Sequence, residues 1–150
     1  MKIGGRTQLN APRTEVWETL TDPRKVTPLL PGGEVVEEEN GETWRARLGV
    51  PTNLGTSTFD FTFTLLEQRP TEYVRVYGHG YGSQNIVDLT AELHLSEEGE
   101  ETQIRWEGDV RLGGVLASLG QRSLLYVLQQ QIENVLRALE AQQSAEAPAQ

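Results

Sequence analysis

The sequence between residues 56 and 66 is TSTFDFTFTLL. Its large apolar side chains are Phe59, Phe61, Phe63 and Leu65, and polar side chains stand between them. Successive side chains of a β-strand point to opposite faces of the sheet, so this alternation places all of the phenylalanines on one face. One apolar and one polar face are typical of a strand in an antiparallel sheet that covers a core on one side.

The same alternation recurs on both sides of this segment. It predicts further strands at residues 2–9, 34–39, 42–50, 72–81, 85–96 and 101–112. The links at residues 67–71, 82–84 and 97–100 have the length of hairpin turns, which join neighbouring antiparallel strands. We therefore expect one antiparallel sheet of seven strands, built mostly from consecutive hairpins.

Complementary side chains predict how three of the hairpins pair. The predicted pairs are Tyr81 with Ile86, Leu95 with Thr102, and Leu65 with Val74. The first pair places Arg75 opposite Glu92, and the second places Ala91 opposite Trp106. The third pair places Phe61 and Phe59 opposite the next two glycines, Gly78 and Gly80, where the rings would cover the glycines and the sheet would bend.

After Gly114 the spacing of apolar residues changes from two to three or four. The positions that follow this new period are Leu116, Leu119, Leu124, Leu128, Ile132, Val135 and Leu139. Such a period predicts an amphipathic helix, about 40 Å long at 1.5 Å per residue. A short helix is also expected at residues 13–21, with Asn10 or Ala11 near its cap, and a second one after Asp22 and Pro23.

The apolar face of the sheet needs a cover, and the C-terminal helix is long enough to supply it. We therefore predict an α+β fold in which a curved seven-stranded antiparallel sheet wraps a long C-terminal helix, with two short helices after the first strand. This is the helix-grip (START-like) arrangement. The domain is expected to span residues 1–141. Residues 142–150 lack a large apolar side chain and are expected to form a disordered tail.

Composition excludes several classes of function. The chain of 150 residues has a formal net charge of −9, which disfavours binding to nucleic acid because phosphate contacts need a basic surface. It contains no cysteine, so neither disulfides nor thiolate chemistry is expected. The N-terminus lacks the apolar core of a signal peptide, which predicts a cytoplasmic protein.

Four segments carry a resemblance to a known family. LNAPRTEVWETLTDP at residues 9–23 resembles the opening of the SRPBCC superfamily. PLLPGGE at 28–34, GHGYG at 78–82 and LGGVLASLGQR at 112–122 are similar to segments of the carbon monoxide dehydrogenase CoxG family. The resemblance extends over residues 2–140. It implies a non-catalytic accessory protein that handles a lipid quinone, associates with a molybdenum-containing carbon monoxide dehydrogenase and contacts the membrane transiently.

A sheet gripping a helix often leaves a cavity between them, and its walls would be the inward positions. The expected ligand-pocket residues are Trp44, Ala46, Leu48, Phe59, Phe61, Phe63, Val76, Gly78, Gly80, Leu89, Ala91, Trp106, Leu116, Leu119 and Leu124. Apolar residues in the connecting segments would form the pocket mouth, namely Leu29, Leu30, Val50, Pro51 and Leu54. No catalytic residue, cofactor or metal site is expected. The alternative is that the aromatic side chains simply fill this space as core.

Two further hypotheses of function remain open. One is an enzyme resembling polyketide cyclases or dehydratases, for which Tyr126 and Arg122 are the candidate polar groups inside the cavity. The other is an interaction subunit with a filled core and no ligand. His79 is expected on the outer face between Asp60 and Asp88, where the carboxylates would stabilise its charged form.

Overall fold

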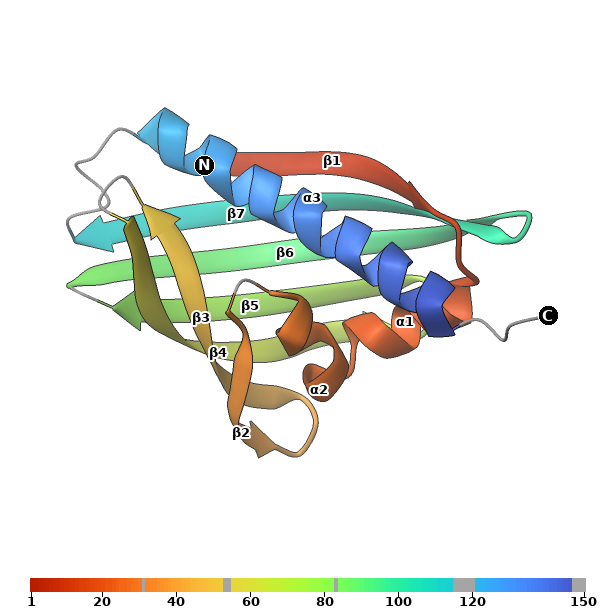
Figure 1. Cartoon of the computed structure of the whole chain (residues 1–150), viewed down its shortest axis with the longest axis horizontal. Coiled ribbons are helices and arrows are strands. Elements are labelled where there is room, and N and C mark those ends of the chain that lie inside the picture. Colours follow the sequence, from red (N-terminus) through yellow and green to blue (C-terminus); the bar gives the residue numbers. More distant parts are fainter. Residues whose placement is uncertain (31, 53–54, 83, 115–120, 147–150) are drawn as a thin grey trace.

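The computed structural model describes residues 1–30, 32–52, 55–82, 84–114 and 121–146 (Figure 1). The chain forms an α+β fold, as predicted. Its elements in order are β1 (Lys2–Leu9), α1 (Arg13–Leu20), α2 (Pro23–Val26), the 3₁₀ turn η1 (Thr27–Leu29), β2 (Glu34–Glu39), β3 (Thr43–Thr52), β4 (Gly55–Arg69), β5 (Tyr73–Gly82), β6 (Asn85–Glu98), β7 (Glu101–Gly114) and α3 (Gln121–Glu146).

All seven strands belong to one antiparallel sheet with the order β1-β7-β6-β5-β4-β3-β2. The first strand pairs with the last, so the sheet is a meander to which β1 is added at the far edge. Helix α3 runs across one face of this sheet, and α1 and α2 lie beside its C-terminal half (Figure 1). The sheet and these helices enclose the core.

The pairing of β5 with β6 is confirmed, with Tyr81 opposite Ile86 and Arg75 opposite Glu92. The predicted pairing of Leu95 with Thr102 is wrong, because Leu95 lies opposite Ile104. Strands β6 and β7 continue to the very end of their hairpin, where Gly99 has a φ of +65°. This tighter turn shifts the register by two residues.

The shift changes which side chains face each other across β6 and β7. Ala91 lies opposite Gly108, whereas Leu93 lies opposite Trp106. The small residue therefore meets a small residue, and the predicted contact between alanine and tryptophan does not form.

The predicted pairing of Leu65 with Val74 is also wrong, since Leu65 lies opposite Val76. A β-bulge between Leu65 and Glu67 inserts one residue into β4. Bulges of this kind re-aim the side chains that follow them and do not show in a simple alternation. As a result Phe61 lies opposite Gly80, and it is Phe63, rather than Phe61, that lies opposite Gly78.

Two helix boundaries differ from the prediction. Helix α3 begins at Gln121, and residues 115–120, which were expected to form its first turn, lie outside the described part of the chain. At the other end α3 continues to Glu146, so residues 142–146 of the expected disordered tail are helical. Gln, Ala and Glu are good helix formers, and this segment contains no proline before Pro148. The cap of α1 is Pro12, one residue beyond the expected positions.

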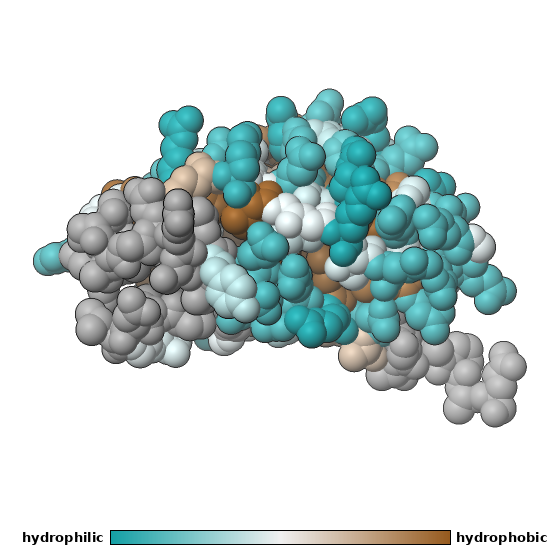
Figure 2. Space-filling model, turned by 90° about the horizontal axis from the view of Figure 1, so that it is seen from above, coloured by the Kyte–Doolittle hydropathy of each residue, from teal (hydrophilic) through white to brown (hydrophobic). Residues whose placement is uncertain are grey.

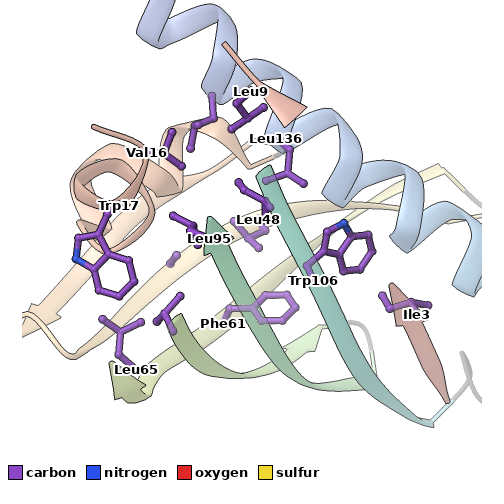
Figure 3. Close-up of a cluster of buried hydrophobic side chains, with 14 of the residues drawn as sticks. Ile3, Leu9, Val16, Trp17, Leu48, Phe61, Leu65, Leu95, Trp106 and Leu136 are labelled. Atoms are coloured by element: carbon purple, nitrogen blue, oxygen red, sulfur yellow. The ribbon is translucent and has the colours of Figure 1, made fainter. Parts of the chain in front are cut away.

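The core lies between the sheet and the helices (Figure 3). Leu9, Val16, Phe59, Ile104 and Leu139 have no exposed surface. They come from the first and last thirds of the chain as well as from the middle of the sheet, which ties α1 and α3 to the strands. Hydrophilic residues dominate the described surface in the view of Figure 2, with a few apolar residues showing between them.

No helix in the described part of the chain is both long and apolar enough to span a membrane.

Candidate functional site

A cavity of about 160 Å³ lies between the inner face of the sheet and the helices. Strands β3 to β7 supply its floor, α3 supplies its roof, and the α1–η1 segment closes one side. The lining residues are Leu20, Val26, Leu30, Trp44, Phe63, Leu65, Val74, Val76, Leu89, Ala91, Leu93, Trp106, Ile132, Val135 and Leu136. Every one of these side chains is apolar apart from the two indole nitrogens.

Seven of the predicted pocket and mouth residues line this cavity. They are Trp44, Phe63, Val76, Leu89, Ala91 and Trp106 from the sheet and Leu30 from the predicted mouth. The other described positions do not line it: Ala46, Leu48, Phe59 and Phe61 are buried core, Gly78 and Gly80 lie beneath aromatic rings, and Leu29 packs against the core. Leu54, Leu116 and Leu119 lie outside the described residues, as do the side chains of Val50, Pro51 and Leu124.

Eight lining residues were not predicted as pocket residues. These are Leu20, Val26, Leu65, Val74, Leu93, Ile132, Val135 and Leu136. Those on α3 belong to its apolar stripe, so the helical period identified them as buried without showing that they border a cavity. Leu20 and Val26 could have been found only from the way α1 and α2 fold back beside α3, which no local pattern encodes.

Aromatic rings occupy the space above the glycines of β5. A Cβ atom on Gly80 would lie 2.5 Å from Cζ of Phe61, and one on Gly78 would lie 3.0 Å from Cε1 of Phe63. The rings of Phe61 and Phe63 stack with centroids 5.3 Å apart and planes 7° apart. The glycines therefore make room for phenylalanines of this chain, as the filled-core alternative predicted for this part of the sheet, and the cavity begins beyond Phe63.

The cavity offers almost no polar chemistry. Trp44 and Trp106 are 4% and 2% exposed, and their Nε1 atoms are buried with no hydrogen-bond partner among the described residues. None of the described lining side chains carries a titratable group. Tyr126, proposed as a polar group inside the cavity, is instead 68% exposed, and the side chain of Arg122 lies outside the described part. Among these residues we find no general acid or base.

His79 lies on the outer face of the sheet, away from the cavity, as expected. Its Nδ1 is 2.5 Å from Oδ1 of Asp88, and the same oxygen accepts a hydrogen bond of 2.8 Å from the hydroxyl of Tyr77. The hydrogen bond with His79 is the main cause that lowers the pKa of Asp88. Asp60 is not its neighbour, because the register places Asp60 opposite Tyr81.

The expectation that His79 is stabilised in its charged form stays a prediction. No group of three or more His, Cys, Asp or Glu side chains that could hold a metal ion occurs among the described residues.

Several solved structures share this fold. A conserved protein from Geobacillus kaustophilus superposes with a TM-score of 0.89 at 20% identity, covering 97% of this chain and 96% of that one. A protein from Thermus thermophilus gives 0.73 at 17% identity, with coverage of 99% and 100%. The Zhui aromatase/cyclase from a Streptomyces species gives 0.71 at 18% identity, with coverage of 99% and 96%. At these identities the likeness concerns the fold alone.

The search of curated proteins found no match. The model of the CoxG family, which is described as a subunit of carbon monoxide dehydrogenase, matches residues 5–144, nearly the whole chain. This confirms the resemblance carried by the proline-glycine, glycine-rich and helix-opening segments. The chain therefore belongs to the carbon monoxide dehydrogenase CoxG family.

Proposed function

We propose that this chain is a non-catalytic binding or carrier protein for a hydrophobic ligand, an isoprenoid quinone or another lipid. We also propose that it serves a molybdenum hydroxylase of the carbon monoxide dehydrogenase type. The apolar cavity between the sheet and α3 is the observation that carries the first part. Membership of the CoxG family supports the second part.

The volume of the cavity limits what it can hold. Sites for drug-sized ligands usually have about 300–1,000 Å³, whereas an engineered apolar cavity of about 150 Å³ binds benzene. With about 160 Å³, this cavity accommodates a single ring or one short branched unit. A longer lipid would thus place one such part among the lining residues, and the rest of the molecule would lie outside the cavity.

An enzymatic role has less support from the site. The structural likeness to an aromatase/cyclase concerns the fold, and a cyclisation would need a group that moves protons. None of the described lining residues provides one. The alternative of an interaction subunit with a filled core is distinguished from a carrier by ligand binding itself.

A quenching titration tests the binding function. Trp44 and Trp106 line the cavity, so a quinone with one isoprene unit should quench their fluorescence as it binds. Ala91→Leu places additional carbon atoms in the cavity and should weaken binding at least tenfold. It should keep the fold, because it fills a void. Thr62→Leu adds a similar side chain at an exposed position of β4 and is the matched control.

Equal quenching of the wild-type chain and Ala91→Leu would place the quinone elsewhere and contradict the assignment of this cavity. Absence of saturable quenching in the wild-type chain would favour the interaction subunit.

The accessory role is tested separately. Addition of the ligand-loaded chain to a carbon monoxide dehydrogenase of the molybdenum type should accelerate quinone reduction in vesicles, and the Ala91→Leu variant should not. Flotation with vesicles would show the transient membrane contact that we propose for a cytoplasmic protein. An unchanged rate of quinone reduction would contradict the partnership and leave ligand binding untouched.

A further inference from the structure

Two indole N–H groups beside the cavity are without a hydrogen-bond acceptor among the described residues. Trp44 on β3 and Trp106 on β7 both line the cavity, and the Nε1 atom of each is shielded from solvent. In Figure 3 the indole of Trp106 stands between the sheet and α3, with its nitrogen on the side of the helix. Buried donors without a partner are rare in folded proteins, so these two call for an explanation.

Neighbouring protein groups do not supply one in the part of the chain that the structure describes. The ring of Phe63 is 5.3 Å from that of Trp44, with the two planes only 30° apart. An indole N–H lies in the plane of its ring, so in this nearly parallel arrangement it does not point at the face of the phenylalanine. A buried water is a poor partner as well, because ordered buried waters usually make about three hydrogen bonds and the described walls offer nothing else to bind.

The charge of the walls restricts the ligand further. No lysine, arginine, histidine or carboxylate is among the described lining residues. A carboxylate or phosphate inside this space would lose its hydration without gaining an opposite charge, which is strongly unfavourable. A neutral oxygen, by contrast, needs only one or two donors, and the two indoles can provide them.

We propose that the part of the ligand held in the cavity is an uncharged ring or short chain bearing a carbonyl-type oxygen, which accepts a hydrogen bond from the indole N–H of Trp44 or Trp106. This inference rests on the proposed ligand-binding function and specifies the chemistry of its ligand. It excludes the ionised head group of a free fatty acid or a phospholipid from this cavity.

Two small probes of similar shape separate the hydrogen bond from apolar burial. Acetophenone carries a carbonyl oxygen, whereas isopropylbenzene replaces it by a methyl group. A net hydrogen bond of ordinary strength corresponds to about five- to tenfold in affinity. Relative to isopropylbenzene, acetophenone should lose this factor in Trp44→Phe, in Trp106→Phe, or in both. The loss of ring area affects both probes alike, so the ratio of their affinities isolates the donor.

Trp17 supplies the matched control. It is 9% exposed, it does not line the cavity, and in Figure 3 its nitrogen points away from the labelled cluster. Trp17→Phe should leave the ratio of the two affinities unchanged. The three substitutions also assign the indole proton resonances, and the resonance of the donor should move downfield with acetophenone and not with isopropylbenzene.

The outcomes separate this inference from the function on which it rests. If both probes bind and none of the substitutions changes their ratio, the hydrogen bond is refuted and the hydrophobic carrier stands. If octanoate binds in the cavity more tightly than acetophenone, the uncharged ligand is refuted. If no probe binds the wild-type chain, the proposed function fails together with the inference.

Discussion

Replacing Gly80 by alanine should destabilise the protein through a clash with Phe61. The added Cβ would lie 2.5–2.6 Å from three carbon atoms of the ring, about 1 Å closer than an ordinary carbon contact of about 3.5 Å. The ring cannot simply turn aside, because it stacks on Phe63 and lies 6.2 Å from Phe59. We therefore expect the overpacking cost of about 1–3 kcal/mol that is typical of a tightly filled core.

Gly113 provides the matched control on β7. A Cβ there would meet Cβ of Ile86 at 3.5 Å, an ordinary contact. Gly113→Ala should therefore be neutral, or stabilise by up to about 1 kcal/mol because alanine lowers the entropy of the unfolded chain. Gly80→Ala should melt about 4–8 °C below this control, at about 2–4 °C per kcal/mol for a domain of this size.

Denaturant unfolding of the two variants, alone and combined with Phe61→Leu, tests the reasoning. The smaller leucine should remove at least half of the cost of Gly80→Ala. Under the pairing expected from the sequence, Phe61 would lie opposite Gly78, and the coupling would appear there. Coupling of Phe61 to Gly78 and none to Gly80 would refute the register of β4 and β5.

Three other predictions concern the core and the outer face. Leu139→Ala should cost about 2–5 kcal/mol in denaturant unfolding, because the side chain is fully buried where α3 packs on the sheet, whereas exposed Leu66→Ala should stay within about 0.5 kcal/mol. Thr102→Val should cost about 1–2 kcal/mol, because its buried hydroxyl donates a 2.7 Å hydrogen bond to a carbonyl oxygen ahead of α1 that would lose its partner. The pKa of Asp88 is lowered, mainly by the hydrogen bond with His79, so its stabilising effect should be present above about pH 4 and be lost as the pH falls further. The difference in melting temperature between wild type and Asp88→Asn should accordingly shrink between about pH 5 and pH 2, and a constant difference would contradict the shift.

Much of the fold could be predicted because it depends on local patterns. The alternation around Phe59 and Phe61 reports which face of a strand is buried, whatever its partner, so all seven strands were found within a few residues of their bounds. The registers of two hairpins could not be predicted. The bulge at Leu66 and the tight turn at Gly99 change the pairing by one or two residues and leave the alternation itself intact.

The candidate site was predictable only in part for a related reason. Whether an inward side chain borders a void depends on what packs above it. Phe61 and Phe63 are both inward on β4, yet the first fills the space over Gly80 and the second lines the cavity. The two unpartnered indoles were likewise invisible to the sequence, which shows that Trp44 and Trp106 face inward but not where their acceptors are.

The most direct test of the account is mass spectrometry of the small molecules extracted from natively purified protein, with wild type and Ala91→Leu prepared in parallel. The account predicts an uncharged, carbonyl-bearing lipid such as a quinone in stoichiometric amount with the wild-type chain, and a large loss of it with the variant. Equal recovery from both proteins, or wild-type protein without any bound lipid, would contradict the claim that the space between the sheet and α3 is a ligand site.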